Sequence, residues 1–114
     1  MNRLYGLIGF PLGHSFSARY FTEKFQRENL SGYEYRNFPL ESIRELPAML
    51  ENHPGLLGFN VTIPYKQEVI PSLTALSTEA REIGAVNCVK ITPQGLYGHN
   101  TDAYGFRKSL LGLI

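Results

Sequence analysis

The stretch Leu56-Leu57-Gly58-Phe59-Asn60-Val61 is the part of this 114-residue sequence that says most about the fold. It is a nearly continuous apolar run, and Pro54-Gly55 turns the chain immediately before it. Short apolar runs between turns are typical of strands that are covered on both faces in a parallel sheet. We therefore expect residues 56–61 to form the central strand of an α/β domain.

Strand and helix patterns alternate on the N-terminal side of this run. Leu4–Gly9 is apolar and ends at glycine and proline, and Tyr33–Phe38 alternates aromatic with polar residues until Pro39. Both segments are expected to be strands. The expected helices are the amphipathic segment that carries Phe16, Tyr20, Phe21 and Phe25, and residues 42–52, which Pro47 divides into two short pieces.

The C-terminal side continues with a short helix and two strands. Residues 77–83 have a helical pattern that Ser77 or Thr74 would cap and that Gly84 ends. Residues 86–92 and 96–100 flank the turn Pro93-Gln94-Gly95, which predicts an antiparallel hairpin at a sheet edge. The complete pattern predicts a three-layer αβα domain with a mostly parallel sheet, helices on both faces and this late antiparallel hairpin. A last helix is expected to begin near Thr101.

Composition excludes several classes of protein. The chain has 43% hydrophobic residues and a formal charge of +1 with interspersed charges, so it is globular and offers no basic surface for nucleic acid or an anionic membrane. Its single cysteine, Cys88, cannot form an internal disulfide, and a reducing cytoplasm is the expected location. The N-terminus resembles neither a signal peptide nor a membrane span.

Four polar clusters lie at the ends of the predicted strands, where open α/β sheets bind their ligands. They supply hydroxyls, amides, one ammonium and one carboxylate, which suits a neutral or anionic ligand with several hydroxyl groups. The clusters are Gly13-His14-Ser15-Phe16-Ser17, Asn60-Val61-Thr62-Ile63-Pro64-Tyr65-Lys66, Ala85-Val86-Asn87-Cys88 and Gly98-His99-Asn100-Thr101-Asp102.

Each of these clusters also has a purely structural interpretation, although Ser17 is harder to explain in this way. Serine at position 15 and Thr101 or Asp102 are well placed to cap helices. Lys66 could be an ordinary exposed lysine, although its place after an apolar strand and a proline favours a cleft. Asn60 and Asn87 could satisfy the backbone of turns. The residue types and their spacing do not decide between the structural and the ligand-binding roles.

The histidines and the cysteine offer little chemistry of their own. His14, His53 and His99 lack the close spacing of a metal site, so no metal is expected. Cys88 lies in an apolar strand pattern and is expected to be an unreactive buried thiol.

The clusters give the chain a resemblance to the N-terminal, substrate-binding domain of shikimate dehydrogenase. The matching motifs occur in the order of the family over nearly the whole chain, and the combination of Asn-Val-Thr-x-Pro-Tyr-Lys with Asn-Thr-Asp is specific. They are Gly9-Phe10-Pro11-Leu12-Gly13-His14-Ser15-Phe16-Ser17, Gly58–Lys66, Gly84-Ala85-Val86-Asn87 and Gly98–Asp102 with Gly105.

The resemblance implies a function in aromatic amino acid biosynthesis, the NADP-dependent reduction of 3-dehydroshikimate to shikimate. It implies that Ser15 and Ser17 contact the substrate carboxylate and that Lys66 and Asp102 lie at the reacting carbon. The residues that it places on substrate hydroxyls are Asn60, Thr62, Asn87 and Asp102.

Two departures from the family pattern affect these expectations. Ala18 stands where the family usually has proline, which should affect the start of the helix more than the site. The chain also has no G-x-G-x-x-G phosphate loop. The resemblance therefore implies a substrate-binding domain over residues 1–100, with residues 101–114 starting the helix toward an absent Rossmann domain that would bind NADP. On this interpretation the 114 residues alone are inactive.

The same residues are compatible with other functions. The chain could be a stand-alone binding module for a cyclic hydroxy acid, but a mere binder has no need of a proton donor such as Lys66 beside Asp102. Quinate is an alternative substrate, although Ser15, Ser17 and Thr62 favour shikimate. An apolar patch on the last helix could also lead to self-association; it comprises Phe106, Leu110, Leu111, Leu113 and Ile114.

Overall fold

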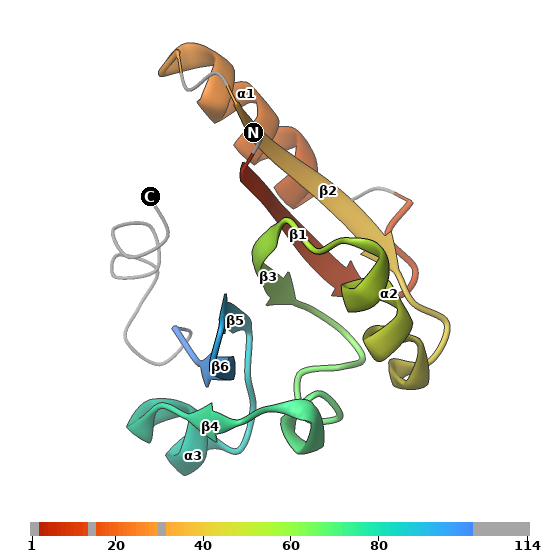
Figure 1. The fold of residues 1–114 in the computed structure, drawn as a ribbon, viewed down its shortest axis with the longest axis vertical. Coiled ribbons are helices and arrows are strands. Elements are labelled where there is room, and N and C mark those ends of the chain that lie inside the picture. Colours follow the sequence, from red (N-terminus) through yellow and green to blue (C-terminus); the bar gives the residue numbers. More distant parts are fainter. Residues whose placement is uncertain (1–2, 14–15, 30–31, 102–114) are drawn as a thin grey trace.

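A computed structural model of the chain describes residues 3–13, 16–29 and 32–101. Within these residues six strands form one sheet in the order β2-β1-β3-β5-β6-β4 (Figure 1). The strands are β1 (Arg3–Gly9), β2 (Tyr33–Pro39), β3 (Leu56–Val61), β4 (Ala75–Leu76), β5 (Cys88–Thr92) and β6 (Gly95–His99). The helices are α1 (Phe16–Arg27), α2 (Leu46–Asn52) and α3 (Thr78–Ile83), with single 3-10 turns η1 (Ile43–Glu45) and η2 (Ile70–Ser72).

The sheet is mixed, with the parallel part at the N-terminal side. β1 pairs in parallel with both β2 and β3, and β4 pairs in parallel with β6. β5 is antiparallel to β3 and to β6. Three of the five pairings are therefore parallel, and the predicted α/β class with a late antiparallel hairpin is confirmed.

The hairpin was expected to form the sheet edge, but β4 pairs with the outer side of β6 and is itself the edge strand. Thr74 donates its backbone N–H to the carbonyl oxygen of Leu96 at 2.7 Å, and its hydroxyl oxygen accepts from the N–H of Leu96 at 3.1 Å. A strand of two residues shows no period-two pattern, so β4 could not be predicted from sequence.

Alternate residues of β1 face two separate apolar clusters. Leu4 and Ile8 join a core that also contains Leu46 and Met49 of α2 and Ala80 of α3. Leu7 points to the opposite face, as neighbouring residues in a strand do, and packs in a cluster of Leu7, Leu12 and Tyr35 with Phe21 and Phe25 of α1. Figure 1 shows α1 along β2 and α3 beside β4. The predicted three-layer arrangement is confirmed.

The turns and helix ends follow the sequence signals. Ser42 and Glu45 form a capping box, and Pro47 stands in the first turn of α2, so the predicted division of residues 42–52 is confirmed. The oxygen of Ser77 accepts from the N–H of Ala80, which makes Ser77 the cap of α3 in preference to Thr74. Gly84 ends α3 with a left-handed φ of 77°.

The strand at residues 56–61 is interior to the sheet, but it is not covered on both faces throughout. Leu4 pairs with Leu56 and Tyr5 pairs with Gly58, so Leu57 falls at a shift in register and is 41% exposed. An extra residue in one strand interrupts the regular alternation of side chains between the two faces of the sheet. The apolar run in the sequence gives no sign of such an interruption. The expectation of full cover is wrong at Leu57.

No helix within the described residues is both long and apolar enough to cross a bilayer. The predicted helix after Thr101, and with it the apolar patch at residues 106–114, lies outside the described residues.

Candidate functional site

The ends of β1 and β3 are joined directly by backbone hydrogen bonds. Thr62 donates its N–H to the carbonyl oxygen of Ile8 at 3.0 Å, and Phe10 donates to the carbonyl oxygen of Ile63 at 3.1 Å. The approach is close, because a Cβ on Gly9 would lie 2.5 Å from Cγ2 of Thr62. The segment that leads toward residues 13–17 therefore starts beside the segment that carries Thr62.

The segment before β5 lies beside the end of β3 and also beside the end of β6. Val61 donates its N–H to the carbonyl oxygen of Asn87 at 2.9 Å, and Val86 donates to the carbonyl oxygen of Lys66 at 2.7 Å. Asn87 in turn donates its backbone N–H to the carbonyl oxygen of His99 at 3.0 Å. Backbone bonds thus bring together the segments that carry Lys66, Asn87 and residues 99–101.

The side chain of Asn87 holds the backbone at the end of the described residues. Its Oδ1 accepts from the N–H of Thr101 at 3.1 Å, and its Nδ2 donates to Oγ1 of Thr101 at 3.0 Å. The alternative structural role of Asn87, that of satisfying a turn backbone, is confirmed. These bonds fix the position of Thr101, the residue that directly precedes Asp102 in the sequence.

Asn100 has a supporting role that the sequence did not distinguish from ligand binding. It is 6% exposed, and its Nδ2 donates to the carbonyl oxygen of Ala85 at 2.9 Å. This bond ties the end of β6 to the segment that carries Asn87.

Asn60 is held by a residue that sequence analysis missed. Its Nδ2 donates to the hydroxyl oxygen of Tyr35 at 2.7 Å, so this part of the amide does not serve a turn backbone. Tyr35 belongs to β2, which is separated from β3 by β1. In the sequence Tyr35 is one aromatic residue in a strand pattern, and no local signal links it to Asn60.

Lys66 is partly buried, which disagrees with the interpretation of a freely exposed surface lysine. The turn that carries it follows a cis peptide bond between Ile63 and Pro64. The neighbouring Tyr65 is 3% exposed and donates its hydroxyl to the carbonyl oxygen of Leu40. Tyr65 therefore anchors the turn in the core, a role that the motif alone did not reveal.

The described residues thus bring together four of the seven predicted site residues. Asn60, Thr62, Lys66 and Asn87 are all partly buried and lie on segments joined by backbone bonds. Ser17 lies in the first turn of α1, but its side chain is outside the described parts. Ser15 and Asp102 also lie outside the described residues.

The histidines that the structure describes do not form a metal centre. Nδ1 of His53 lies 2.8 Å from the carbonyl oxygen of Met49, and its ring packs edge-on against Phe38. His99 is exposed. Across residues 3–13, 16–29 and 32–101, no three side chains of His, Cys, Asp or Glu gather as metal ligands would.

Two acidic groups beside Asn60 have raised pKa values. Cys88 pairs with Asn60 in the β3–β5 register, and burial raises the pKa of its thiol from 9.0 to about 11. Burial also raises the pKa of Tyr35 to about 12, although its hydrogen bond with Asn60 acts in the opposite direction. Both groups are protonated at neutral pH, in agreement with the expectation of an unreactive thiol at Cys88.

The raised thiol pKa predicts a loss of stability in alkali. Above pH 9 the unfolded chain releases the thiol proton while the folded chain retains it, so the unfolded state binds fewer protons and stability falls with rising pH. For a shift from 9.0 to about 11 the loss reaches about 1.4 kcal/mol at pH 10. Urea unfolding at pH 7 and pH 10 measures it.

The variant Cys88→Ala isolates this contribution from the other groups that titrate in alkali. The effect of the substitution on packing is the same at both pH values. The thiol is therefore reported by the difference between the two proteins in how much unfolding free energy each loses from pH 7 to pH 10. We expect Cys88→Ala to lose about 1.4 kcal/mol less than the parent between pH 7 and pH 10. Equal losses for the two proteins would show that the thiol is not protected by burial.

The sequence comparisons identify one family. The family model described as the shikimate dehydrogenase substrate binding domain matches residues 7–89. Shikimate dehydrogenase (NADP(+)) of Clostridium perfringens is 40% identical over 116 residues, which cover 95% of this chain and 40% of that relative. The chain therefore spans well under half the length of this curated relative.

Solved structures agree with this assignment. Shikimate 5-dehydrogenase of Thermus thermophilus in complex with NADP(H) and shikimate matches with a TM-score of 0.81 and 31% identity, over 98% of this chain and 42% of that one. The ligand-free 5-ketofructose reductase of a Gluconobacter strain matches with a TM-score of 0.83 and 29% identity, over 100% and 41%. The family model matches well over half of the residues of this chain, and the chain therefore belongs to the family of shikimate dehydrogenase substrate-binding domains.

Proposed function

We propose that this chain is the shikimate-binding part of an NADP-dependent shikimate dehydrogenase, which reduces 3-dehydroshikimate to shikimate. The observation that carries the proposal is the meeting of the Asn60–Thr62, Lys66 and Asn87 segments through backbone bonds at one end of the sheet. These segments bring amide, hydroxyl and ammonium groups to one place, as a polyhydroxylated acid requires. The relatives of known name and bound ligand support the same substrate.

Each site residue has a proposed partner on the substrate. Ser15 and Ser17 would donate hydrogen bonds to the carboxylate. Asn60, Thr62, Asn87 and Asp102 would bind hydroxyl groups. Asn87 would bind a hydroxyl group in addition to its hydrogen bonds with Thr101, the residue that precedes Asp102 in the sequence. The roles of Ser15, Ser17 and Asp102 rest on the family motif.

Lys66 is proposed to supply the proton of the reaction. Reduction of a ketone adds a hydride to the carbonyl carbon, and the electron pair of the broken C=O π bond moves to the oxygen and takes up a proton. The Lys66 ammonium would stabilise the negative charge on that oxygen and transfer one proton to it. Asp102 would hold the ammonium in place by a charge-assisted hydrogen bond.

The nicotinamide cofactor is proposed to bind outside these residues. The sequence has no G-x-G-x-x-G phosphate loop, and the curated relative that it matches is much longer. When bound, NADPH supplies the hydride. The 114 residues supply substrate orientation and the proton, and the isolated chain is accordingly expected to bind shikimate without turning it over.

A titration of the isotope-labelled 114-residue chain with shikimate tests the substrate. We expect chemical shift changes concentrated at the side-chain amides of Asn60 and Asn87 and at the backbone of Thr62 and Lys66. Lys66→Ala should weaken binding about tenfold or more, because it removes a charge-assisted bond. Lys90→Ala is the matched control, since Lys90 is exposed on neighbouring β5 and should bind shikimate as the parent does.

The same titration decides between substrates. Quinate and 5-ketofructose are added in parallel, the latter because a 5-ketofructose reductase shares this fold. Shikimate is expected to bind more tightly than either. Absence of shifts at the site residues at millimolar shikimate, or preferential binding of another ligand, would overturn the assignment of shikimate.

A further inference from the structure

We infer that Tyr35 is a positioning residue, which fixes the carboxamide of Asn60 so that its Oδ1 accepts a hydrogen bond from a substrate hydroxyl group. The inference rests on the proposed function for the identity of the ligand. It concerns a residue on the far side of β1 that no motif includes.

Tyr35 reaches Asn60 across an intervening strand. In the β1–β2 and β1–β3 registers, Tyr5 pairs with both Tyr35 and Gly58, and Leu7 pairs with Asn60. Residues that pair in this way point to one side of the sheet, so Tyr35 and Asn60 share the face that α1 covers at β2. The tyrosine hydroxyl oxygen lies 2.7 Å from Nδ2 of Asn60.

The tyrosine ring is held firmly enough to serve as a fixed partner. It is 8% exposed and stacks on Phe21 of α1, with ring centroids 4.8 Å apart and ring planes inclined by 21°. Leu7 and Leu12 complete its cluster. Because Phe21 belongs to α1, the helix whose first turn includes Ser17, Tyr35 connects the packing of this helix to the orientation of Asn60.

The hydrogen bond determines which end of the amide faces a ligand. A carboxamide donates through its NH₂ group and accepts through its carbonyl oxygen. Nδ2 is engaged by Tyr35, and Oδ1 makes no hydrogen bond to any residue that the structure describes. Held this way, Asn60 presents an acceptor, and an acceptor requires a ligand O–H or N–H.

This orientation also assigns the part of the substrate that Asn60 contacts. The reacting group of the ketone substrate is a carbonyl, which can only accept hydrogen bonds, so Asn60 Oδ1 cannot recognise it. Asn60 must contact a hydroxyl that does not react. Such a contact contributes equally in the ground and transition states, so its loss raises KM and leaves kcat nearly unchanged.

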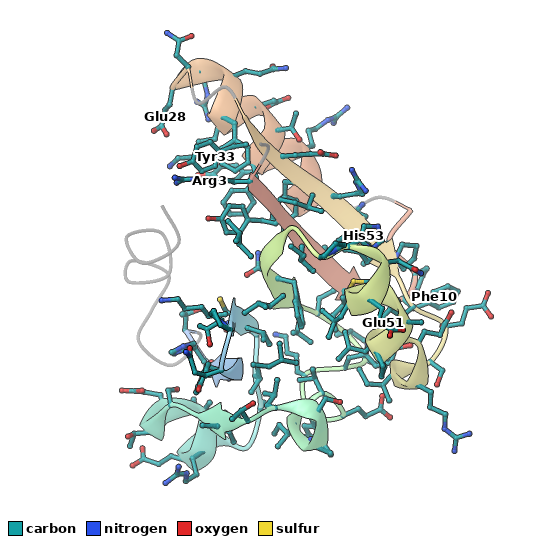
Figure 2. The ribbon with its side chains drawn as sticks, in the orientation of Figure 1. Arg3, Phe10, Glu28, Tyr33, Glu51 and His53 are labelled. Carbon is teal, nitrogen blue, oxygen red and sulfur yellow. The ribbon has the colours of Figure 1, made fainter. Side chains whose placement is uncertain are left out.

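The variant Tyr35→Phe removes the hydroxyl and keeps the ring. Tyr33→Phe is a matched control, because Tyr33 lies in the same strand and its hydroxyl accepts from Arg3 at 2.7 Å. Figure 2 shows Arg3 and Tyr33 side by side at the end of the sheet away from Phe10, which follows β1 at the site end. If Tyr35→Phe weakens shikimate binding and Tyr33→Phe does not, the effect is specific to the hydroxyl of Tyr35 and is not a general effect of removing a tyrosine hydroxyl from β2.

Shikimate binding is measured for Tyr35→Phe, for Asn60→Ala and for the double variant. We expect Tyr35→Phe to weaken binding by about 3- to 10-fold, the value of one net hydrogen bond, and Tyr33→Phe to leave it unchanged. In the Asn60→Ala background, Tyr35→Phe should cause no further loss. Parent-like binding by Tyr35→Phe, or independent multiplicative losses, would overturn the inference.

A measurement without ligand separates this inference from the proposed function. NMR relaxation of the Asn60 side-chain NH₂ group reports how tightly the amide is held. We expect its order parameter to fall in Tyr35→Phe and to stay unchanged in Tyr33→Phe. If the parent fails to bind shikimate but this fall is seen, the substrate assignment fails and the positioning role stands. An unchanged order parameter refutes the positioning role whether or not shikimate binds.

Discussion

Replacing Lys66 by methionine is expected to lower kcat for shikimate dehydrogenation by roughly 10²- to 10⁴-fold, the usual contribution of a positioned proton donor or acceptor. The assay uses a chimera in which this chain replaces the corresponding residues of the Clostridium perfringens relative, with which it shares 40% identity. Methionine matches the length of the aliphatic stem of lysine and keeps its apolar packing. The loss therefore reports the ammonium group, which no other described residue at the site can replace.

Two further variants of the chimera show whether Lys66 transfers a proton or only supplies charge. Lys66→Arg keeps a positive charge, but guanidinium does not lose its proton at working pH. We expect Lys66→Arg to bind shikimate better than Lys66→Met and to remain equally slow. Lys90→Met, at the exposed position of β5, should retain full activity. Substantial turnover by Lys66→Arg would limit Lys66 to charge stabilisation, and parent-like turnover by Lys66→Met would remove it from the mechanism.

Much of the fold could be predicted because its periodic elements agree with its turn residues. β1, α1 and β2 have regular apolar spacing, and Gly84 and Pro47 mark helix boundaries that the structure reproduces. The failures lie where a pairing partner decides the structure. β4 exists because Thr74 meets Leu96 from a distant part of the chain, and Leu57 is exposed because the register shifts there. Neither fact is encoded in a local pattern.

The candidate site shows the same division between local and distant information. Polar residues at strand ends were sufficient to select Asn60, Thr62, Lys66 and Asn87 as candidates, since strand ends in such sheets collect ligand-binding groups. Their supports were not predictable. Tyr35 is 25 residues from Asn60 and Tyr65 is 25 residues from Leu40, and both contacts depend on strand order. The supporting residues of a site are therefore harder to find than the residues they hold.

The second large effect is expected at Gly9, where β1 meets the Thr62 segment. A Cβ at this position would lie 2.5 Å from Cγ2 of Thr62 and 3.0 Å from both the carbonyl oxygen of Ile63 and Cδ2 of Leu12. One methyl group must therefore push the Thr62 segment away from β1. We expect Gly9→Ala to reduce the free energy of unfolding by about 1–3 kcal/mol, as overpacking does, and to weaken shikimate binding by displacing Thr62.

Urea unfolding of Gly9→Ala, Thr62→Ser, the double variant Gly9→Ala/Thr62→Ser and the control Gly13→Ala identifies the cause of this loss. A Cβ on Gly13 would meet nothing within 4 Å, so Gly13→Ala should be neutral or stabilise by up to about 1 kcal/mol through the unfolded chain. Thr62→Ser removes Cγ2 and keeps the hydroxyl. It should restore part of the stability lost by Gly9→Ala, because the closest of the three contacts disappears. Equal stability of the two glycine variants would mean that β1 and the Thr62 segment are not packed this closely, and additive losses in the double variant would exclude Thr62 as the cause.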